Sequence, residues 1–237
     1  MIAFNLAPPT AHDIFLAVVS LSAIYSALYI AVVLNREGRP AWIGRKVIHI
    51  SAGTIIALVL VSFSSLYAPT VTLVVFLGSL FLASLFNFES VKTMINAASR
   101  EDGSTQGAVA SAAGAVVSYG IVFFLTADSQ WIFVAAVLAV SWGDGAGEMI
   151  GRPFGNTHYT VAKTTRSLEG SLAVFVLTGL AVSVSIGLFG SHKVSCILLW
   201  IIGASLVVAL LEAVSPYWTD NVFIPLAVAS MLTLLSS

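Results

Sequence analysis

Long apolar runs alternate with short polar stretches along the whole chain. Eight of these runs are long enough, in whole or in part, to cross a bilayer as a helix, which takes roughly 20 residues. They cover residues 13–34, 46–63, 69–86, 107–126, 131–150, 171–190, 194–213 and 222–236, and the last is the shortest. The apolar positions are continuous and do not alternate with a period of two, which favours helices over barrel strands. The pattern predicts an all-α, polytopic membrane bundle of seven or eight transmembrane helices, forming one domain over residues 1–237.

The composition agrees with a membrane location. Hydrophobic residues make up 58% of the 237 residues and charged residues 9%, with a mean hydropathy of +1.00, whereas a soluble domain carries roughly 25% charged residues. The net charge of −1 provides no general attraction to nucleic acid, so no nucleic-acid partner is expected. Cys196, the single cysteine, lies in an apolar run, and we expect it to be buried as a small hydrophobic side chain.

The basic residues indicate which loops face the cytoplasm. Nine of the ten lysines and arginines fall in alternate polar stretches, around residues 35–46, 87–106 and 151–170. Because cytoplasmic loops collect Lys and Arg, we expect both termini outside and the polar, chemically rich stretches inside. Arg36 is the first basic residue, so the first apolar run lacks the start of a signal peptide and is predicted to be a retained helix. The lack of a transit-peptide-like start favours a prokaryotic cell membrane.

Charge and glycine are concentrated in the stretch WGDGAGEMIGRPFGNT, residues 142–157. Asp144, Glu148 and Arg152 would share one face of a helix at spacings of four. Acids at membrane depth cost at least a few kcal/mol and usually line a functional cavity. Small residues allow a second helix or a ligand to approach the backbone closely, and the stretch contains Gly143, Gly145 and Gly147. Simple helix packing is the alternative interpretation, which explains the glycines but not the acids.

Formal nucleotide-binding motifs are absent from the sequence. The segment GAGEMIG has G-x-G-x-x-x-G spacing and follows a membrane helix, whereas the dinucleotide motif follows a strand. No G-x-x-x-x-G-K-[ST] sequence occurs anywhere in the chain. If this protein handles phosphate, it does so without a P-loop.

A second cluster lies in VAKTTRSLEGSLAVF, residues 161–175. Lys163 and Arg166 supply positive charge, and Ser167 is placed to cap the helix that follows. A helix N-terminus with hydroxyl and basic groups is suited to phosphate binding. Glu169 and Gly170 stand at the start of the same helix. An ordinary basic loop beside the membrane is the alternative.

Two further stretches carry polar groups at helix ends. GRKVIHISAG places Arg45, Lys46 and His49 at a membrane boundary, where the cations could serve topology alone and His49 could make a core hydrogen bond. EAVSPYWTDNVFIPL places Asp220 and Asn221 at the start of the last helix. Asp220 could act as a helix cap or as a ligand of a divalent metal.

Together, RKVIHISAG, WGDGAGEMIGRPFG, TTRSLEGSLAVF and EAVSPYWTDNVFIPL resemble the polyprenol kinase family, which includes dolichol, phytol and farnesol kinases. The four stretches follow the family's order between residues 45 and 226. The short chain and the RSLEGS form are most similar to the phytol and farnesol kinases. The resemblance implies a kinase that phosphorylates a membrane isoprenoid alcohol, such as phytol, farnesol, geranylgeraniol or a polyprenol, with CTP as donor and Mg²⁺ as cofactor.

The resemblance and the residue chemistry together assign roles in such an enzyme. Catalytic roles are expected for Asp144, His49 and Glu169. Ligands of Mg²⁺ are expected among Asp144, Glu148, Glu169 and Asp220. Contacts to the nucleotide are expected from Arg45, Lys46, Gly143, Gly145, Arg152, Lys163, Arg166, Ser167, Gly170 and Asn221.

Two other functions remain open from the sequence. A cytidylyltransferase that makes a CDP-lipid shares a similar G-D and E-G pattern, but its usual ending, H-G-G followed by D-R and a further D, is missing. A non-enzymatic transporter would place its polar groups near the membrane midplane, whereas here they gather on one predicted face. The loop 87–106 matches the kinase family loosely and Glu148 is more acidic than its pattern, which leaves the identity of the alcohol open.

Overall fold

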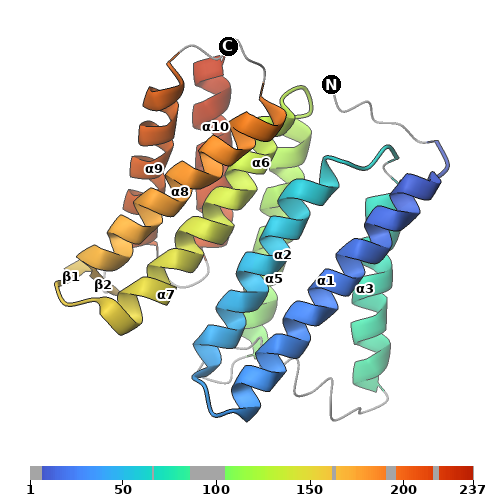
Figure 1. Ribbon diagram of the computed structural model, residues 1–237, viewed down its shortest axis with the longest axis horizontal. Helices are drawn as coiled ribbons and strands as arrows, with labels where there is room; N and C mark the ends of the chain where they lie inside the picture. Colours follow the sequence, from blue (N-terminus) through green and yellow to red (C-terminus); the bar gives the residue numbers. More distant parts are fainter. Residues whose placement is uncertain are drawn as a thin grey trace. The chain divides into compact units, whose positions relative to one another are not determined.

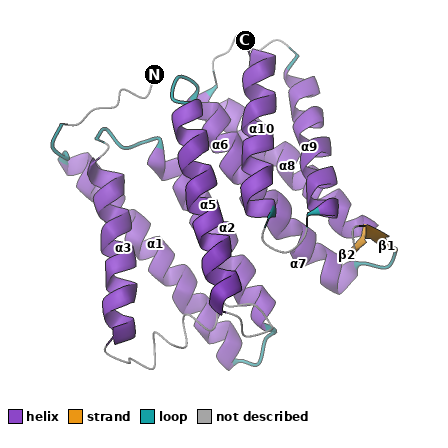
Figure 2. Ribbon diagram, turned by 180° about the vertical axis from the view of Figure 1, so that it is seen from behind, coloured by secondary structure: helices purple, strands orange, loops and turns teal. Residues whose placement is uncertain are grey.

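The computed structural model describes residues 7–65, 67–85, 105–161, 164–190, 196–215 and 219–236. Lys163 and most of the predicted loop 87–106 lie outside this part of the chain. Figures 1 and 2 show that the described part is almost entirely helical. The elements are α1 (Ala11–Arg36), α2 (Ala41–Leu60), α3 (Tyr67–Leu85), α5 (Thr105–Leu125), α6 (Gln130–Leu138), the π-helical η1 (Ala139–Asp144), α7 (Gly145–Phe154), β1 (His158–Val161), β2 (Thr164–Ser167), α8 (Leu168–Phe189), α9 (Ile197–Val214) and α10 (Asp220–Ser236).

The all-α, multi-pass membrane architecture is confirmed. Within the described residues, five helices are long and apolar enough to cross a membrane: α1, α2, the rod Gln130–Phe154 formed by α6, η1 and α7, α8 and α9. Three shorter apolar helices cover Tyr67–Ser79, Ala113–Leu125 and Asp220–Leu234. The number of seven or eight spans therefore stays a prediction.

Helix boundaries agree with the predicted runs to within five residues, and one departure lies before α9. Cys196 precedes α9 in a left-handed backbone conformation, with φ of 60°. Its thiol is exposed, so the predicted burial of Cys196 is wrong. The apolar run 194–213 begins before this turn, whereas α9 begins after it, at Ile197. Hydropathy alone therefore predicted a helix start that is too early.

By its packing, the chain divides into two compact units, residues 3–108 and residues 109–237, and the single domain stays a prediction. In the first unit, α1 and α2 approach closely at Gly44. A Cβ atom on Gly44 would lie 3.1 Å from the Ala31 methyl group. Small residues at such a crossing let the two backbones come together, which is the usual basis of helix association in lipid.

A buried carboxylate fixes the start of α1 in this unit. Asp13 has no accessible surface and forms a capping box with Thr10. Its oxygens accept hydrogen bonds from the Thr10 N–H at 2.8 Å and from the Ser64 N–H and hydroxyl, both at 2.7 Å. Ser64 follows α2, so Asp13 joins the first turn of α1 to the end of the neighbouring helix.

The Asp13 network predicts a loss of stability on its removal. In Asp13→Ala the N–H groups of Thr10 and Ser64 lose the carboxylate that accepts their hydrogen bonds, and a hydrogen bond to a charged group contributes about 1.5–3 kcal/mol. We expect the thermal unfolding temperature in detergent to fall by several degrees. Glu37→Gln, at an exposed acid that follows α1, is the control and should leave it unchanged. Equal unfolding temperatures for the two variants would contradict the structural role of Asp13.

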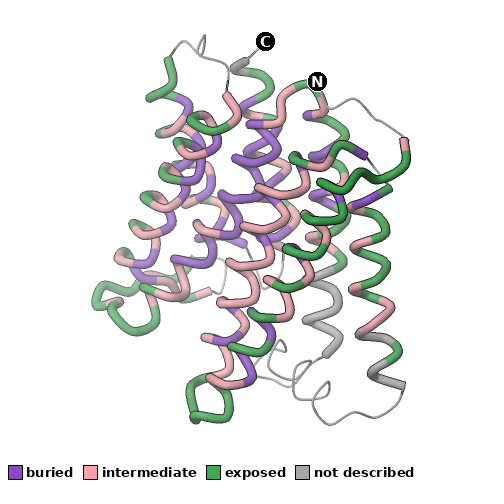
Figure 3. The backbone as a smooth tube through the Cα atoms, turned by 45° about the vertical axis from the view of Figure 1, so that its right-hand side comes forward, coloured by how far each residue is buried: buried purple, intermediate pink, exposed green. Residues whose placement is uncertain are grey.

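The second unit is built around the rod formed by α6, η1 and α7. Every residue from Trp131 to Ser141 is buried, and buried residues are purple in Figure 3. A helix that is apolar on all sides belongs in the interior of a bundle, and α8 and α10 pack against this one. The rod therefore carries Asp144 at the end of its buried part.

A π-helical segment interrupts the rod at residues 139–144. Such i→i+5 segments are rare and often occur at functional sites, because they insert a residue and change which side chains face a neighbouring helix. Apolar periodicity does not predict this segment, since its residues fit an ordinary helix pattern. Asp144 is its last residue and so stands where the helix geometry changes.

A small β-hairpin follows α7, where the sequence predicted a polar loop. Strands β1 and β2 pair antiparallel, with Tyr159 opposite Arg166 and Val161 opposite Thr164. The β-branched residues Thr160, Val161, Thr164 and Thr165 favour extended backbone. That enrichment was the available signal, and it was overlooked because the stretch is short.

Candidate functional site

Three glycines at spacings of four, Gly143, Gly147 and Gly151, bring η1 and α7 against α8. A Cβ atom on Gly143 would lie 2.5 Å from a hydroxyl oxygen of α8, and one on Gly147 would lie 2.8 Å from an α8 methyl group. In the order of the glycines, the α8 residues in closest contact include Thr178, Val174 and Gly170. The partners descend by four as the glycines ascend by four, so the two helices cross antiparallel in matched register.

The close crossing of these helices explains why glycine occupies these positions. Gly143 faces α8, so its lack of a side chain serves helix contact, the alternative that the sequence left open. Gly145 is buried. A Cβ atom on Gly147 would also lie 3.5 Å from a carboxylate oxygen of Glu212. The same close crossing therefore leaves room for a buried acid from α9.

Two of the predicted acids lie on elements that pack together, η1 and α10. Asp144 ends η1 and Asp220 begins α10, and the two residues are 6% and 7% exposed. The buried Tyr119 of α5 interacts electrostatically with both carboxylates, and its hydroxyl lies beside Ser141. Three elements that are distant in sequence thus place a phenol and two acids in one buried region. Tyr119 was missed from the sequence because a lone tyrosine in an apolar run carries no motif.

The start of α10 is fixed by hydrogen bonds around Asp220. The Asn221 N–H donates to the Asp220 carboxylate at 2.8 Å. The Ser118 hydroxyl, from α5, donates to the Asn221 carbonyl oxygen at 2.8 Å. These bonds tie α10 to α5 at the level of the acid pair.

An ion pair holds the hairpin to the end of α9. Arg166 Nε lies 3.1 Å from Glu212 Oε1, and Arg166 Nη2 donates to the Glu212 carbonyl oxygen at 3.4 Å. The Thr164 hydroxyl donates to the Ala213 carbonyl oxygen at 3.3 Å. A cation at the C-terminus of a helix also interacts favourably with its dipole. Glu212 is thus the partner of Arg166.

Glu212→Gln should loosen this hairpin. The variant removes the charge that Arg166 faces and lowers the free energy of unfolding by about 1–3 kcal/mol, less than for a fully buried pair because Arg166 is partly exposed. Thermal unfolding and protease cleavage at residues 158–167 would measure the effect. Glu148→Gln, which breaks a more exposed pair, is the control and should cost under about 1 kcal/mol. A Glu212 variant as stable and as resistant as the control would show that the pair does not anchor the hairpin.

The predicted capping role of Ser167 is confirmed. Its hydroxyl accepts the Gly170 N–H at 3.1 Å and lies 3.5 Å from the Gly151 carbonyl oxygen. Glu169 accepts hydrogen bonds from the Thr157 N–H at 3.2 and 3.3 Å. Both side chains organise the hairpin and the first turn of α8.

Glu148 and Arg152 form an ion pair of 2.7 Å on α7. The helix continues to Phe154, so these residues follow Asp144 on one face, as the spacing predicted. The Arg152 side chain is 44% exposed. The pair lies nearer the surface than Asp144 does.

Arg45, Lys46 and His49 belong to α2 in the other unit, residues 3–108. Lys46 is buried, whereas Arg45 and His49 are half-buried. Burial of a lysine in an apolar helix is costly and usually marks a role beyond topology. Of the three residues, the buried Lys46 is therefore the strongest candidate for a functional role.

The acids expected to hold a metal do not form one cluster. Within the described residues, no three His, Cys, Asp or Glu side chains are grouped closely enough to hold an ion. Glu148 is paired with Arg152 and Glu169 with the Thr157 backbone. Asp144 and Asp220 both act electrostatically on Tyr119. Two carboxylates suit Mg²⁺, because this ion commonly takes one or two from protein and completes its shell with phosphate oxygens and water.

Comparison with known proteins gives no match, since no family model, no curated protein and no solved structure is significantly similar to the chain.

Proposed function

We propose that this chain is a membrane phosphotransferase that uses CTP to phosphorylate the hydroxyl group of an isoprenoid alcohol. The observation that carries the proposal is the burial of two acids, Asp144 and Asp220, on the packed elements η1 and α10 within a unit of apolar helices. Buried acids at membrane depth are costly and are usually kept for function. The four kinase-like stretches supply the reaction type, and the apolar surroundings suit a lipid-soluble acceptor.

The proposed step is a direct transfer of the γ-phosphoryl group. The alcohol oxygen forms a bond to the γ-phosphorus while the bond from that phosphorus to the β–γ bridging oxygen breaks. CDP leaves with the bonding electrons, and the alcohol proton passes to a base. Asp144 or His49 is the proposed base. Such a reaction needs mainly positioning and charge stabilisation from the protein.

Asp144 and Asp220 are the proposed ligands of Mg²⁺, which when bound would offset the charge of the transferring phosphates. Cations of the chain would add to this, with Arg166, Lys163, Arg45 and Lys46 as candidates. Arg166 can contact a phosphate while paired with Glu212, because a guanidinium carries five N–H donors.

The proposed topology gives soluble nucleotides access to these residues. With eight spans and both termini outside, the stretches 35–46, 87–106 and 151–170 face the cytoplasm. The last short loop, residues 214–221, does so as well. CTP and Mg²⁺ would approach from that side, and the alcohol would come from the membrane.

A transfer assay tests the reaction class. Purified protein in nanodiscs receives Mg²⁺, γ-labelled CTP or ATP, and phytol, farnesol, geranylgeraniol, a polyprenol or diacylglycerol. The proposal expects label in an isoprenoid alcohol from CTP, with CDP released. CDP-lipid and pyrophosphate from phosphatidate and α-labelled CTP would replace the kinase by a cytidylyltransferase. No product in either assay, with nucleotide-independent lipid flux in liposomes, would favour a transporter.

A further inference from the structure

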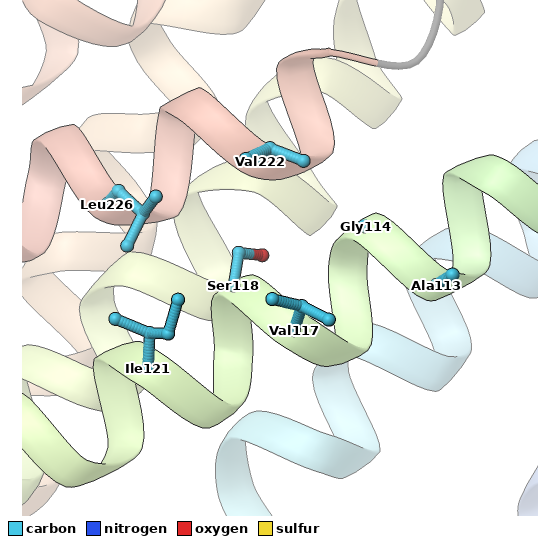
Figure 4. Close-up of a pocket in the computed structure, with 7 residues that line it drawn as sticks. All are labelled: Ala113, Gly114, Val117, Ser118, Ile121, Val222 and Leu226. Atoms are coloured by element: carbon cyan, nitrogen blue, oxygen red, sulfur yellow. The ribbon is translucent and has the colours of Figure 1, made fainter.

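The groove between α5 and α10 offers no place for a phosphate group. Figure 4 shows its lining, which is apolar except for Ser118, and the Ser118 hydroxyl already donates to the Asn221 carbonyl oxygen. A fixed arrangement of charged groups in the same unit lies instead at the end of α9, where Arg166 of the hairpin meets Glu212. This ion pair is therefore a place where an anion could be held.

Glu212 is the buried member of this pair. Its side chain is 5% exposed, whereas the Arg166 side chain is 29% exposed. Helix α7 lies against the carboxylate, since a Cβ atom on Gly147 would be 3.5 Å from Glu212 Oε1, in van der Waals contact. The carboxylate is thus enclosed between α7 and Arg166, and the cation offsets a buried charge that would otherwise be costly.

Both contacts of the Arg166 guanidinium go to the same residue. Nε lies 3.1 Å from Glu212 Oε1, and Nη2 donates to the Glu212 carbonyl oxygen at 3.4 Å. Two points of contact fix the plane of the group. Within the part of the chain that the structure describes, the two N–H groups of Nη1 have no acceptor, and Nη2 carries a second N–H. Donors fixed in one plane in this way match the oxygens of a phosphate group.

Anchoring of the hairpin does not by itself require two charges. The Thr164 hydroxyl also bonds the hairpin to α9, at the Ala213 carbonyl oxygen, and the hydroxyls of Tyr159 and Ser171 bond it to α8. A largely buried ion pair often stabilises a protein no better than apolar residues of the same size. The charges therefore point to a role in which the orientation of the guanidinium matters.

We propose that Glu212 is a positioning residue, which holds Arg166 so that the free edge of its guanidinium receives a phosphate group of the nucleotide. The inference rests on the proposed function for the identity of the ligand as a nucleoside triphosphate. The direction of one effect separates this role from simple charge repulsion. Removal of a negative charge beside an anion site would by itself tighten anion binding, whereas loss of an oriented guanidinium weakens it.

Binding of γ-labelled CTP without an acceptor alcohol tests this role. Equilibrium dialysis with the full chain in nanodiscs gives the Kd for CTP. We expect Arg166→Ala to raise this Kd about ten- to a hundredfold, and Glu212→Gln to raise it at least about threefold. Thr164→Val is the matched control, because it removes an uncharged bond between the hairpin and α9. It should leave the Kd within about twofold of the wild-type value.

Chemical rescue separates the orientation of the guanidinium from the stability of the hairpin. Guanidinium chloride should restore CTP binding to Arg166→Ala, relative to the same concentration of sodium chloride, because Glu212 can hold the added ion. It should not restore binding when Arg166→Ala is combined with Glu212→Gln. Rescue that persists in the double variant, or a Glu212→Gln protein that binds CTP as tightly as wild type or more tightly, would overturn the positioning role and leave the kinase standing.

Inorganic triphosphate in the same dialysis distinguishes the phosphate site from the reaction. The same pattern of losses and rescue with inorganic triphosphate, in a protein that transfers no phosphate from CTP, would uphold the phosphate site and overturn the kinase. Wild-type protein that binds neither CTP nor inorganic triphosphate would overturn both.

Discussion

Asp144→Asn is expected to lower the rate of phosphoryl transfer by roughly a hundred- to a thousandfold, with the protein still folded. The buried carboxylate ends the π-helical segment and lies near Tyr119, together with Asp220. Asparagine keeps the size of the side chain but removes the negative charge proposed to hold Mg²⁺ and to accept the alcohol proton. Initial rates of label transfer from γ-labelled CTP to the lipid phase measure the effect.

Glu37→Gln is the control for this variant. Glu37 is an exposed acid that follows α1 and has no role in the proposed reaction, so its neutralisation should change the transfer rate by less than about threefold. Circular dichroism and unfolding temperature establish that both variants fold. A folded Asp144→Asn protein with full turnover would remove Asp144 from the mechanism.

Gly170→Ala is expected to destabilise the second unit by about 1–3 kcal/mol. A Cβ atom on Gly170 would lie 2.9 Å from the Gly147 carbonyl oxygen and 3.1 Å from the Gly151 Cα. Both neighbours are backbone atoms, so the crossing of α7 and α8 would have to open to accommodate the methyl group. Thermal unfolding in detergent should show a lower midpoint.

Gly187→Ala provides the control in the same helix. No atom lies within 4 Å of the position that its Cβ would take, and alanine has the better helix propensity by up to about 1 kcal/mol. Gly187→Ala should therefore leave the midpoint unchanged or raise it. Equal midpoints for the two variants would show that the glycine register does not set the helix crossing.

The helices could be predicted well because the length of an apolar run depends only on consecutive residues of the sequence. The runs 13–34 and 171–190 became α1 and α8 with boundaries within three residues. The Ser167 cap was also predicted, since capping depends on residues next to each other in sequence. The hairpin of residues 158–167 and the π-helical segment 139–144 depend on contacts with α8 and α9, which apolar periodicity does not report.

The sequence could predict which residues belong to the candidate site, but not which of them contact one another. Asp144 and Asp220 were identified from charge within apolar surroundings, whereas their shared neighbour Tyr119 had no sequence signal. Arg166 was expected to contact phosphate, yet its nearest charge is Glu212, 46 residues further along the chain. Pairings of this kind are set by how helices pack, and one sequence does not specify that packing residue by residue.

The central claim is that Asp144 and Asp220 act as one unit in phosphoryl transfer. A double-mutant cycle on the initial rate of transfer from CTP to the alcohol tests it most directly, using Asp144→Asn, Asp220→Asn and the double variant. Residues that act together give losses that do not add. The account predicts that the double variant is scarcely slower than the worse single variant. Losses that multiply, or a folded Asp220→Asn protein with the wild-type rate, would contradict it.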